Sequence, residues 1–115
     1  NLYGSEIMIT QITEKELNKV NDSEWTIVYL YADWCKVCAG FSPIVEHYSN
    51  EYTQHQWLKM NAAENIEYSK EIDFERIPYI SIYHLGNFIG GEVISTEEQL
   101  NGLMSLIGNF NERSA

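Results

Sequence analysis

The stretch over residues 25–32, with the sequence WTIVYLYA, limits the fold of this chain more than any other segment. It is nearly continuous in β-branched, aromatic and aliphatic residues, so neither of its faces is suited to water. An apolar run of this length is typical of a central β-strand that is covered on both sides. We therefore expect a sheet with helices packed on both faces.

Apolar spacing and turn residues predict the other elements, in the order β-α-β-α-β-α-β-β-α. The predicted strands cover residues 7–12, 25–32, 56–60, 79–84 and 88–94, and the first three predicted helices cover residues 13–20, 33–52 and 65–72. This alternation, followed by a hairpin, predicts an α/β fold with a mixed central sheet of four to five strands sandwiched by helices. We expect one domain over residues 1–115, with its core at about residues 7–110.

Helix signals accompany these segments. Thr13 and Glu16 have the spacing of a capping box, and the last helix begins at Ser95 or Thr96. Pro43 falls inside the second helix, where it removes a backbone donor and should kink the axis. The expected inner stripes follow helical spacing: Phe41, Ile44, Val45, Tyr48 and Tyr52 in the second helix, and Leu100, Leu103, Met104, Ile107 and Phe110 in the last.

Charge and hydropathy exclude two classes of partner. The chain has 17 acidic and 7 basic residues, a net charge of −10, and no cluster of Lys or Arg. Phosphate binding needs concentrated basic side chains, so we expect no nucleic-acid partner. No apolar run approaches the ~20 residues of a membrane-spanning helix, so we expect no membrane partner either. The acidity favours solubility, and we expect a monomer.

The chain has two cysteines, Cys35 and Cys38, separated by two residues. A stapled secreted domain would use more cysteines at wider spacing, and a zinc site would normally need four ligands. The histidines His47, His55 and His84 have no paired spacing with the cysteines. We therefore expect no metal and no bound cofactor, and the pair is interpreted as redox-active.

Chemistry follows from the position of the pair at the start of a helix. A helix N-terminus stabilises an anion, which favours the thiolate over the thiol. Cys35, nearer the start, is predicted to be the nucleophile, and Cys38, one turn further, the resolving thiol. Trp34 is predicted to be a partly exposed platform for substrate, with a core aromatic as the alternative. Lys36 either helps Cys35 to ionise or is merely solvated.

The motif Ala-Asp-Trp-Cys-Lys-Val-Cys at residues 32–38, followed by Pro43 and then by Ile77-Pro78, resembles the thioredoxin family. The resemblance runs from about residue 7 to residue 110 in matching order. It implies a thioredoxin-like fold, with Pro78 as a cis-proline that faces the cysteines. It also implies that the backbone of Ile77 pairs with an extended substrate segment. Lys59 matches the family's buried lysine near the active site.

Three features depart from the family pattern. Lys36-Val37 replaces the usual Gly-Pro between the cysteines, a difference that typically shifts the redox potential. Tyr29 occupies the position of the buried acid that assists proton transfer to the resolving cysteine. A tyrosine, with a pKa near 10, cannot act as a carboxylate base at neutral pH. Ile94 aligns with the glycine that usually lines the substrate groove.

The resulting functional hypothesis is a thiol–disulfide oxidoreductase that reduces or exchanges disulfides in protein substrates. Its expected partners are those substrates and a reductase or other thiol electron donor. One alternative is a disulfide oxidase or isomerase of an extracytoplasmic compartment. Another is a thioredoxin-fold binding module whose cysteines no longer turn over. We expect a cytoplasmic protein, or an extracytoplasmic one if a signal segment has been removed.

Overall fold

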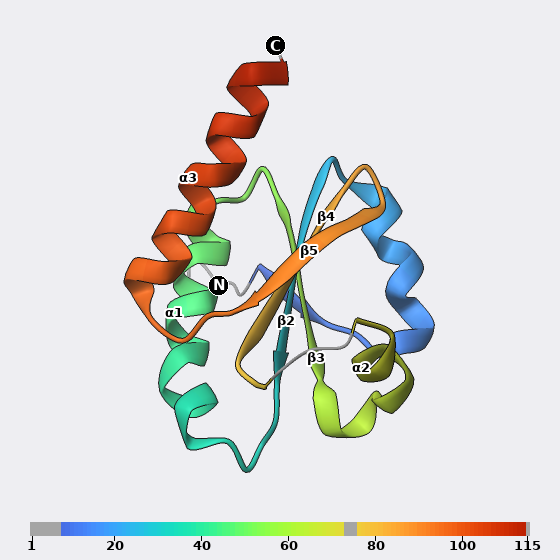
Figure 1. Cartoon of the computed structure of the whole chain (residues 1–115). Coiled ribbons are helices and arrows are strands. Elements are labelled where there is room, and N and C mark those ends of the chain that lie inside the picture. Colours follow the sequence, from blue (N-terminus) through green and yellow to red (C-terminus); the bar gives the residue numbers. More distant parts are fainter. Residues whose placement is uncertain (1–7, 73–75, 115) are drawn as a thin grey trace, which may run out of the picture.

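Strand β2 (Trp25–Tyr31) lies in the middle of a five-stranded sheet in a computed structural model that describes residues 8–72 and 76–114 (Figure 1). The other strands are β1 (Ile9–Gln11), β3 (Gln56–Asn61), β4 (Tyr79–His84) and β5 (Asn87–Val93). Their order is β1-β3-β2-β4-β5, with β1 and β2 parallel to β3, and β4 antiparallel to both β2 and β5. The predicted mixed α/β sheet is confirmed.

Helices cover both faces of this sheet. The 3-10 helix η1 (Glu14–Asp22) and helix α2 (Ile66–Ile72) lie on one side, and α1 (Lys36–Glu51) and α3 (Glu97–Ser114) on the other (Figure 1). A short 3-10 helix, η2 (Ala62–Glu64), connects β3 to α2. None of the helices in the described ranges is long and apolar enough to cross a membrane.

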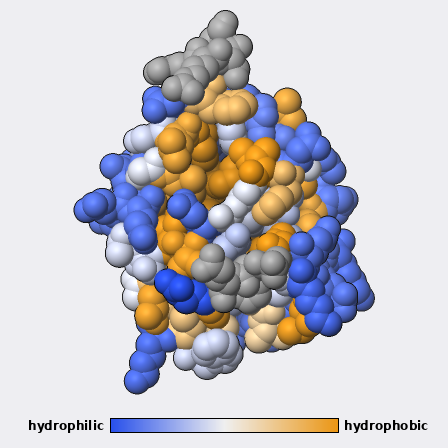
Figure 2. Space-filling view, in the orientation of Figure 1, coloured by the Kyte–Doolittle hydropathy of each residue, from blue (hydrophilic) through white to orange (hydrophobic). Residues whose placement is uncertain are grey.

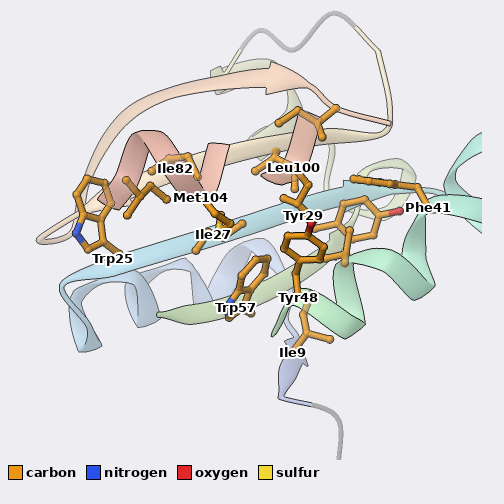
Figure 3. Packing of buried hydrophobic residues seen from close by; sticks show 14 residues of the cluster. Ile9, Trp25, Ile27, Tyr29, Phe41, Tyr48, Trp57, Ile82, Leu100 and Met104 are labelled. Atoms are coloured by element: carbon orange, nitrogen blue, oxygen red, sulfur yellow. The ribbon is translucent and has the colours of Figure 1, made fainter. Parts of the chain in front are cut away.

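The side chains of β2 divide between two hydrophobic clusters because successive residues of a strand point to opposite faces. Ile27 and Tyr29 belong to the cluster that includes residues of α1 and α3, shown in Figure 3. Val28 and Leu30 belong to the second cluster, with residues of η1 and α2. All residues of β2 except the partly buried Tyr31 are buried, which explains why its sequence has no polar alternation.

Side-chain caps begin two of the helices. The backbone N–H of Thr13 donates to Glu16 Oε1 at 3.0 Å, which confirms the predicted capping box at η1. At α3, Thr96 and Gln99 form a reciprocal pair in which each backbone N–H donates to the other's side chain at 3.2 Å. Thr96, not Ser95, is therefore the residue whose side chain caps the last helix.

Several boundaries differ from the sequence prediction. Strand β1 begins at Ile9, while Ile7 lies outside the described residues. Helix α1 begins at Lys36 and not at residue 33, because Cys35 itself is the extended N-cap residue. The segment η2 was not predicted. Phe110 is 43% exposed, although its ring still packs edge to face on Trp25.

The β4–β5 hairpin turns through Leu85 and Gly86, both of which have positive φ angles, 52° and 83°. Beyond the turn, the ladder between the two strands shifts its register between Ile82 and Tyr83. Gly90 has a φ of 151° within β5, the exposed edge strand. Positive φ is unstrained in glycine, which has no Cβ.

A hollow of about 440 Å³ lies between β5 and α3. Apolar side chains gather in this part of the surface (Figure 2). Trp25 lies in its lining, together with the exposed side chains Ile89, Leu106 and Phe110. Trp25 begins β2, whereas the cysteines follow the end of that strand, so the hollow is remote from them.

We predict that Gly86→Ala destabilises the protein while Gly108→Ala does not. A left-handed alanine costs about 1–2 kcal/mol, and a Cβ at position 86 would also collide with the Asn21 side chain. Gly108 is exposed in α3 with free space for a Cβ, so alanine there should stabilise the helix by about 0.5–1 kcal/mol. Urea unfolding measures both changes; an equal free energy of unfolding for the two variants would contradict this account.

Candidate active site

Cys35 and Cys38 form a disulfide at the N-terminal end of α1. Cys35 is the N-cap, with φ −86° and ψ 108°, and its N–H donates to the carbonyl of Ala32 at 3.2 Å. The turn lies between the end of β2 at Tyr31 and the start of α1 at Lys36, where the chain reverses so that α1 covers the sheet. The pair thus lies at the start of α1, directly after the buried strand, as the sequence predicted.

The local electrostatics favour negative charge on Cys35. The backbone N–H of Cys38 points at Cys35 Sγ, at a distance of 3.1 Å. In the reduced state the same N–H, together with the helix dipole, stabilises a thiolate on Cys35. Cys35 is 9% exposed and Cys38 1%, so Cys35 is the more accessible sulfur.

The exposed residues beside the disulfide include apolar side chains and one charge of each sign, Asp33 and Lys36. Trp34 is 73% exposed, which excludes the alternative that it is a core aromatic. Val37 is also exposed, and Lys36 between the cysteines is exposed to solvent. An exposed indole next to a reactive sulfur is available to a docking peptide.

Ile77 lies against the cysteines because β4 runs antiparallel to β2, with Tyr79 opposite Leu30. The partly buried side chain of Ile77 packs on the cluster formed by Ala32, Cys35 and Cys38. The Ile77–Pro78 peptide bond is cis, and the carbonyl of Pro78 accepts a hydrogen bond from the N–H of Ile94 at 3.3 Å. The structure therefore brings Ile77 to Cys35 and Cys38, with Pro78 next to Ile77 in the chain.

Tyr29 lies behind the pair, buried in the sheet. Its hydroxyl donates to the carbonyl oxygen of Cys38 at 3.3 Å and lies 2.8 Å from Ser42 Oγ. Burial raises the pKa of the Tyr29 hydroxyl, although the hydrogen bond with Ser42 opposes the shift. Tyr29 therefore remains protonated and neutral where the family pattern has an acid.

Lys59 is opposite Tyr29 in the β2–β3 ladder. It is half-buried, not buried as the resemblance implied, and its Nζ lies 3.9 Å from Glu46 Oε2 of α1. The same ammonium is 5.9 Å from the centre of the Tyr31 ring. Its closest described charge is thus Glu46, two turns along α1 from Cys38.

Comparisons with known proteins agree with this geometry. A family model, Thioredoxin, matches residues 8–108, well over half of the chain. The chain belongs to the thioredoxin family. Its thioredoxin relatives include a protein of Rickettsia bellii, 28% identical over 108 residues that cover 89% of this chain and 98% of the relative. Thioredoxin 1 of Plasmodium falciparum is 26% identical over 70 residues, 61% of this chain and 67% of the relative.

Solved thioredoxin structures share the fold. A Plasmodium falciparum thioredoxin superposes with a TM-score of 0.78 at 21% identity, covering 84% of this chain and 96% of that chain. Spinach chloroplast thioredoxin f superposes with a TM-score of 0.77 at 18% identity, covering 87% and 93%. Family membership and the Cys35–Cys38 disulfide together make this chain a thiol–disulfide oxidoreductase.

The sequence did not single out Ser42 or Glu46. Cys38, Ser42 and Glu46 are spaced four residues apart, so they lie along one face of α1. That spacing could have indicated that polar side chains follow Cys38 along one face of the helix. Among the described residues, no group of three or more His, Cys, Asp or Glu side chains is arranged to hold a metal ion.

We predict that the reduced protein is alkylated first at Cys35. Cys38 is almost completely buried, and the helix N-terminus favours the Cys35 thiolate. Substoichiometric iodoacetamide at pH 7, followed by peptide mass mapping, measures the distribution of the label. The urea-unfolded chain is the control, in which both thiols have a pKa of about 8.5 and react alike. Preferential labelling of Cys38 in the folded protein would contradict the prediction.

Proposed function

We propose that this protein reduces or exchanges disulfides in protein substrates, with Cys35 as the attacking sulfur and Cys38 as the resolving sulfur. The observation that carries the proposal is the location of Cys35 at the N-cap of α1, with the Cys38 N–H directed at its Sγ. That arrangement stabilises a thiolate on Cys35 and keeps the second sulfur within bonding reach.

The proposed reaction has two exchange steps. The Cys35 thiolate attacks one sulfur of the substrate disulfide; the substrate S–S bond breaks, and the other sulfur leaves as a thiolate that takes a proton. Cys38 then loses its proton to solvent and attacks Cys35 Sγ, which breaks the mixed disulfide and releases the second substrate thiolate. Two electrons pass to the substrate, and the protein becomes the disulfide.

The substrate segment is proposed to dock on Trp34 and to pair with the backbone of Ile77 beside Pro78. The exposure of the indole and the packing of Ile77 on the cysteine cluster support this placement. Lys36 is proposed to lower the pKa of the Cys35 thiol by its charge. Lys59 is also proposed to tune the pKa of the active-site thiols, through its ion pair with Glu46 at 3.9 Å.

The proposed cycle needs a thiol electron donor, such as a reductase, and no bound cofactor. We propose that the chain acts as one monomeric domain over residues 1–115, with its core at about residues 7–110. We also propose a reducing compartment such as the cytoplasm, where thiol systems keep such a pair in its dithiol form. The relatives named above are thioredoxins, which supports a reductive role.

We predict that Cys38→Ser traps mixed disulfides with protein substrates. Cys35 would still attack, and no second thiol would resolve the adduct. Non-reducing electrophoresis detects the adducts, which dithiothreitol should release. Cys35→Ser is the matched control and should trap far less. Equal trapping by the two variants would contradict the assigned roles.

The reduction potential separates a reductase from an oxidant. We expect the pair, equilibrated with glutathione buffers, to have a potential nearer to about −270 mV, the benchmark value of thioredoxin itself, than to the value of an oxidant, above about −200 mV. A value above about −200 mV would favour the extracytoplasmic oxidase or isomerase. A pair that stays inert to exchange would contradict the function altogether.

A further inference from the structure

The Tyr29 hydroxyl joins β2 to the first turns of α1. It is hydrogen-bonded to the Cys38 carbonyl oxygen at 3.3 Å and to Ser42 Oγ at 2.8 Å. Tyr29 is buried, and its ring packs against Tyr31 and Phe41, so the position of the hydroxyl is fixed by the core. Both partners belong to the part of α1 that carries the resolving sulfur.

This part of α1 needs such support. Pro43 lies inside the helix and has no N–H to donate to the carbonyl of Ala39, one residue after Cys38. A helix is less rigid where one of its backbone hydrogen bonds is missing. The Tyr29 hydroxyl links the sheet to the residue that precedes each end of the missing bond, to Cys38 before Ala39 and to Ser42 before Pro43.

We propose that Tyr29 and Ser42 are positioning residues that hold Cys38 in line for attack on the mixed disulfide. The inference rests on the proposed function, since it concerns its second step. The Cys38 thiolate forms a bond with Cys35 Sγ, the bond between Cys35 and the substrate sulfur breaks, and that sulfur leaves with the electron pair. The proton of Cys38 goes to solvent, and Tyr29 keeps its own.

Geometry is the reason why the effect falls on the second step. Attack within a mixed disulfide requires the sulfurs to be aligned, and small misplacements lower the rate strongly. The first step needs an accessible Cys35 thiolate, which the N-cap geometry orients, and it needs no alignment with Cys38 Sγ. Loss of the Tyr29 hydroxyl should therefore leave the first step nearly unchanged.

Limiting 5,5′-dithiobis(2-nitrobenzoate) tests the two steps separately in one experiment. Attack by Cys35 releases one coloured thiolate, and resolution by Cys38 releases the second. We expect Ser42→Ala, which loses one hydrogen bond, to slow the second release about fivefold, and Tyr29→Phe, which loses two, to slow it by at least as much. Both variants should slow the first release by less than about twofold. Ser42→Thr, which keeps a hydroxyl, should restore the second rate.

Ser49→Ala is the matched control. Ser49 is a buried serine of the same helix, and its hydroxyl donates to the Glu46 carbonyl at 2.7 Å, away from the cysteines. The Ser49→Ala variant should lose a comparable hydrogen bond and release both coloured thiolates at the wild-type rates. Slowing of the second release by Ser49→Ala, or equal slowing of both releases by Tyr29→Phe, would overturn the proposal, since either result indicates a general structural effect.

The pH profile distinguishes positioning from proton transfer. A positioning residue lowers the second rate at every pH and leaves its apparent pKa where the wild-type protein has it. A shifted apparent pKa in Tyr29→Phe would overturn the proposal in favour of a proton relay. If the wild-type protein releases no first thiolate, the proposed function fails; if all variants release both thiolates at wild-type rates, only the present inference fails.

Discussion

Burial of β2 on both faces is the constraint on which the rest of the structure depends. Ile27 and Tyr29 bind α1 and α3 to one side of the sheet, while Val28 and Leu30 bind η1 and α2 to the other. Because the strand is held in this way, its end is fixed in space, and the turn that follows places Cys35 at the start of α1. The chemistry at the edge of the molecule is positioned by apolar packing at its centre.

The same constraint explains how much the sequence could predict. The run WTIVYLYA and the cysteine pair directly after it predicted the central strand, the helix and the site. The capping box of Thr13 and Glu16 was predictable because its hydrogen bonds are local. Contacts that join distant segments were not: the pairing of Lys59 with Glu46, and the contact of Tyr29 with Ser42, depend on how α1 lies on the sheet. Side-chain periodicity does not specify that arrangement.

Tyr29 illustrates how a local departure from a family can be accommodated. A carboxylate at this depth would carry a charge that burial disfavours, whereas a tyrosine keeps its proton and forms hydrogen bonds without charge. The acidic group near the sheet is instead Glu46, which lies on α1 beside Lys59 and is partly exposed. The carboxylate therefore lies nearer to solvent, on α1, and the buried group is the neutral hydroxyl of Tyr29.

The disulfide between Cys35 and Cys38 uses every cysteine of the chain. Residues 1–115 contain no third thiol that could compete for either sulfur, so this stretch has no alternative internal disulfide. Each molecule, when not joined to another thiol, is either the dithiol or one defined disulfide. It therefore takes up or releases electrons two at a time. A thiol titration then gives the fraction of molecules that are reduced.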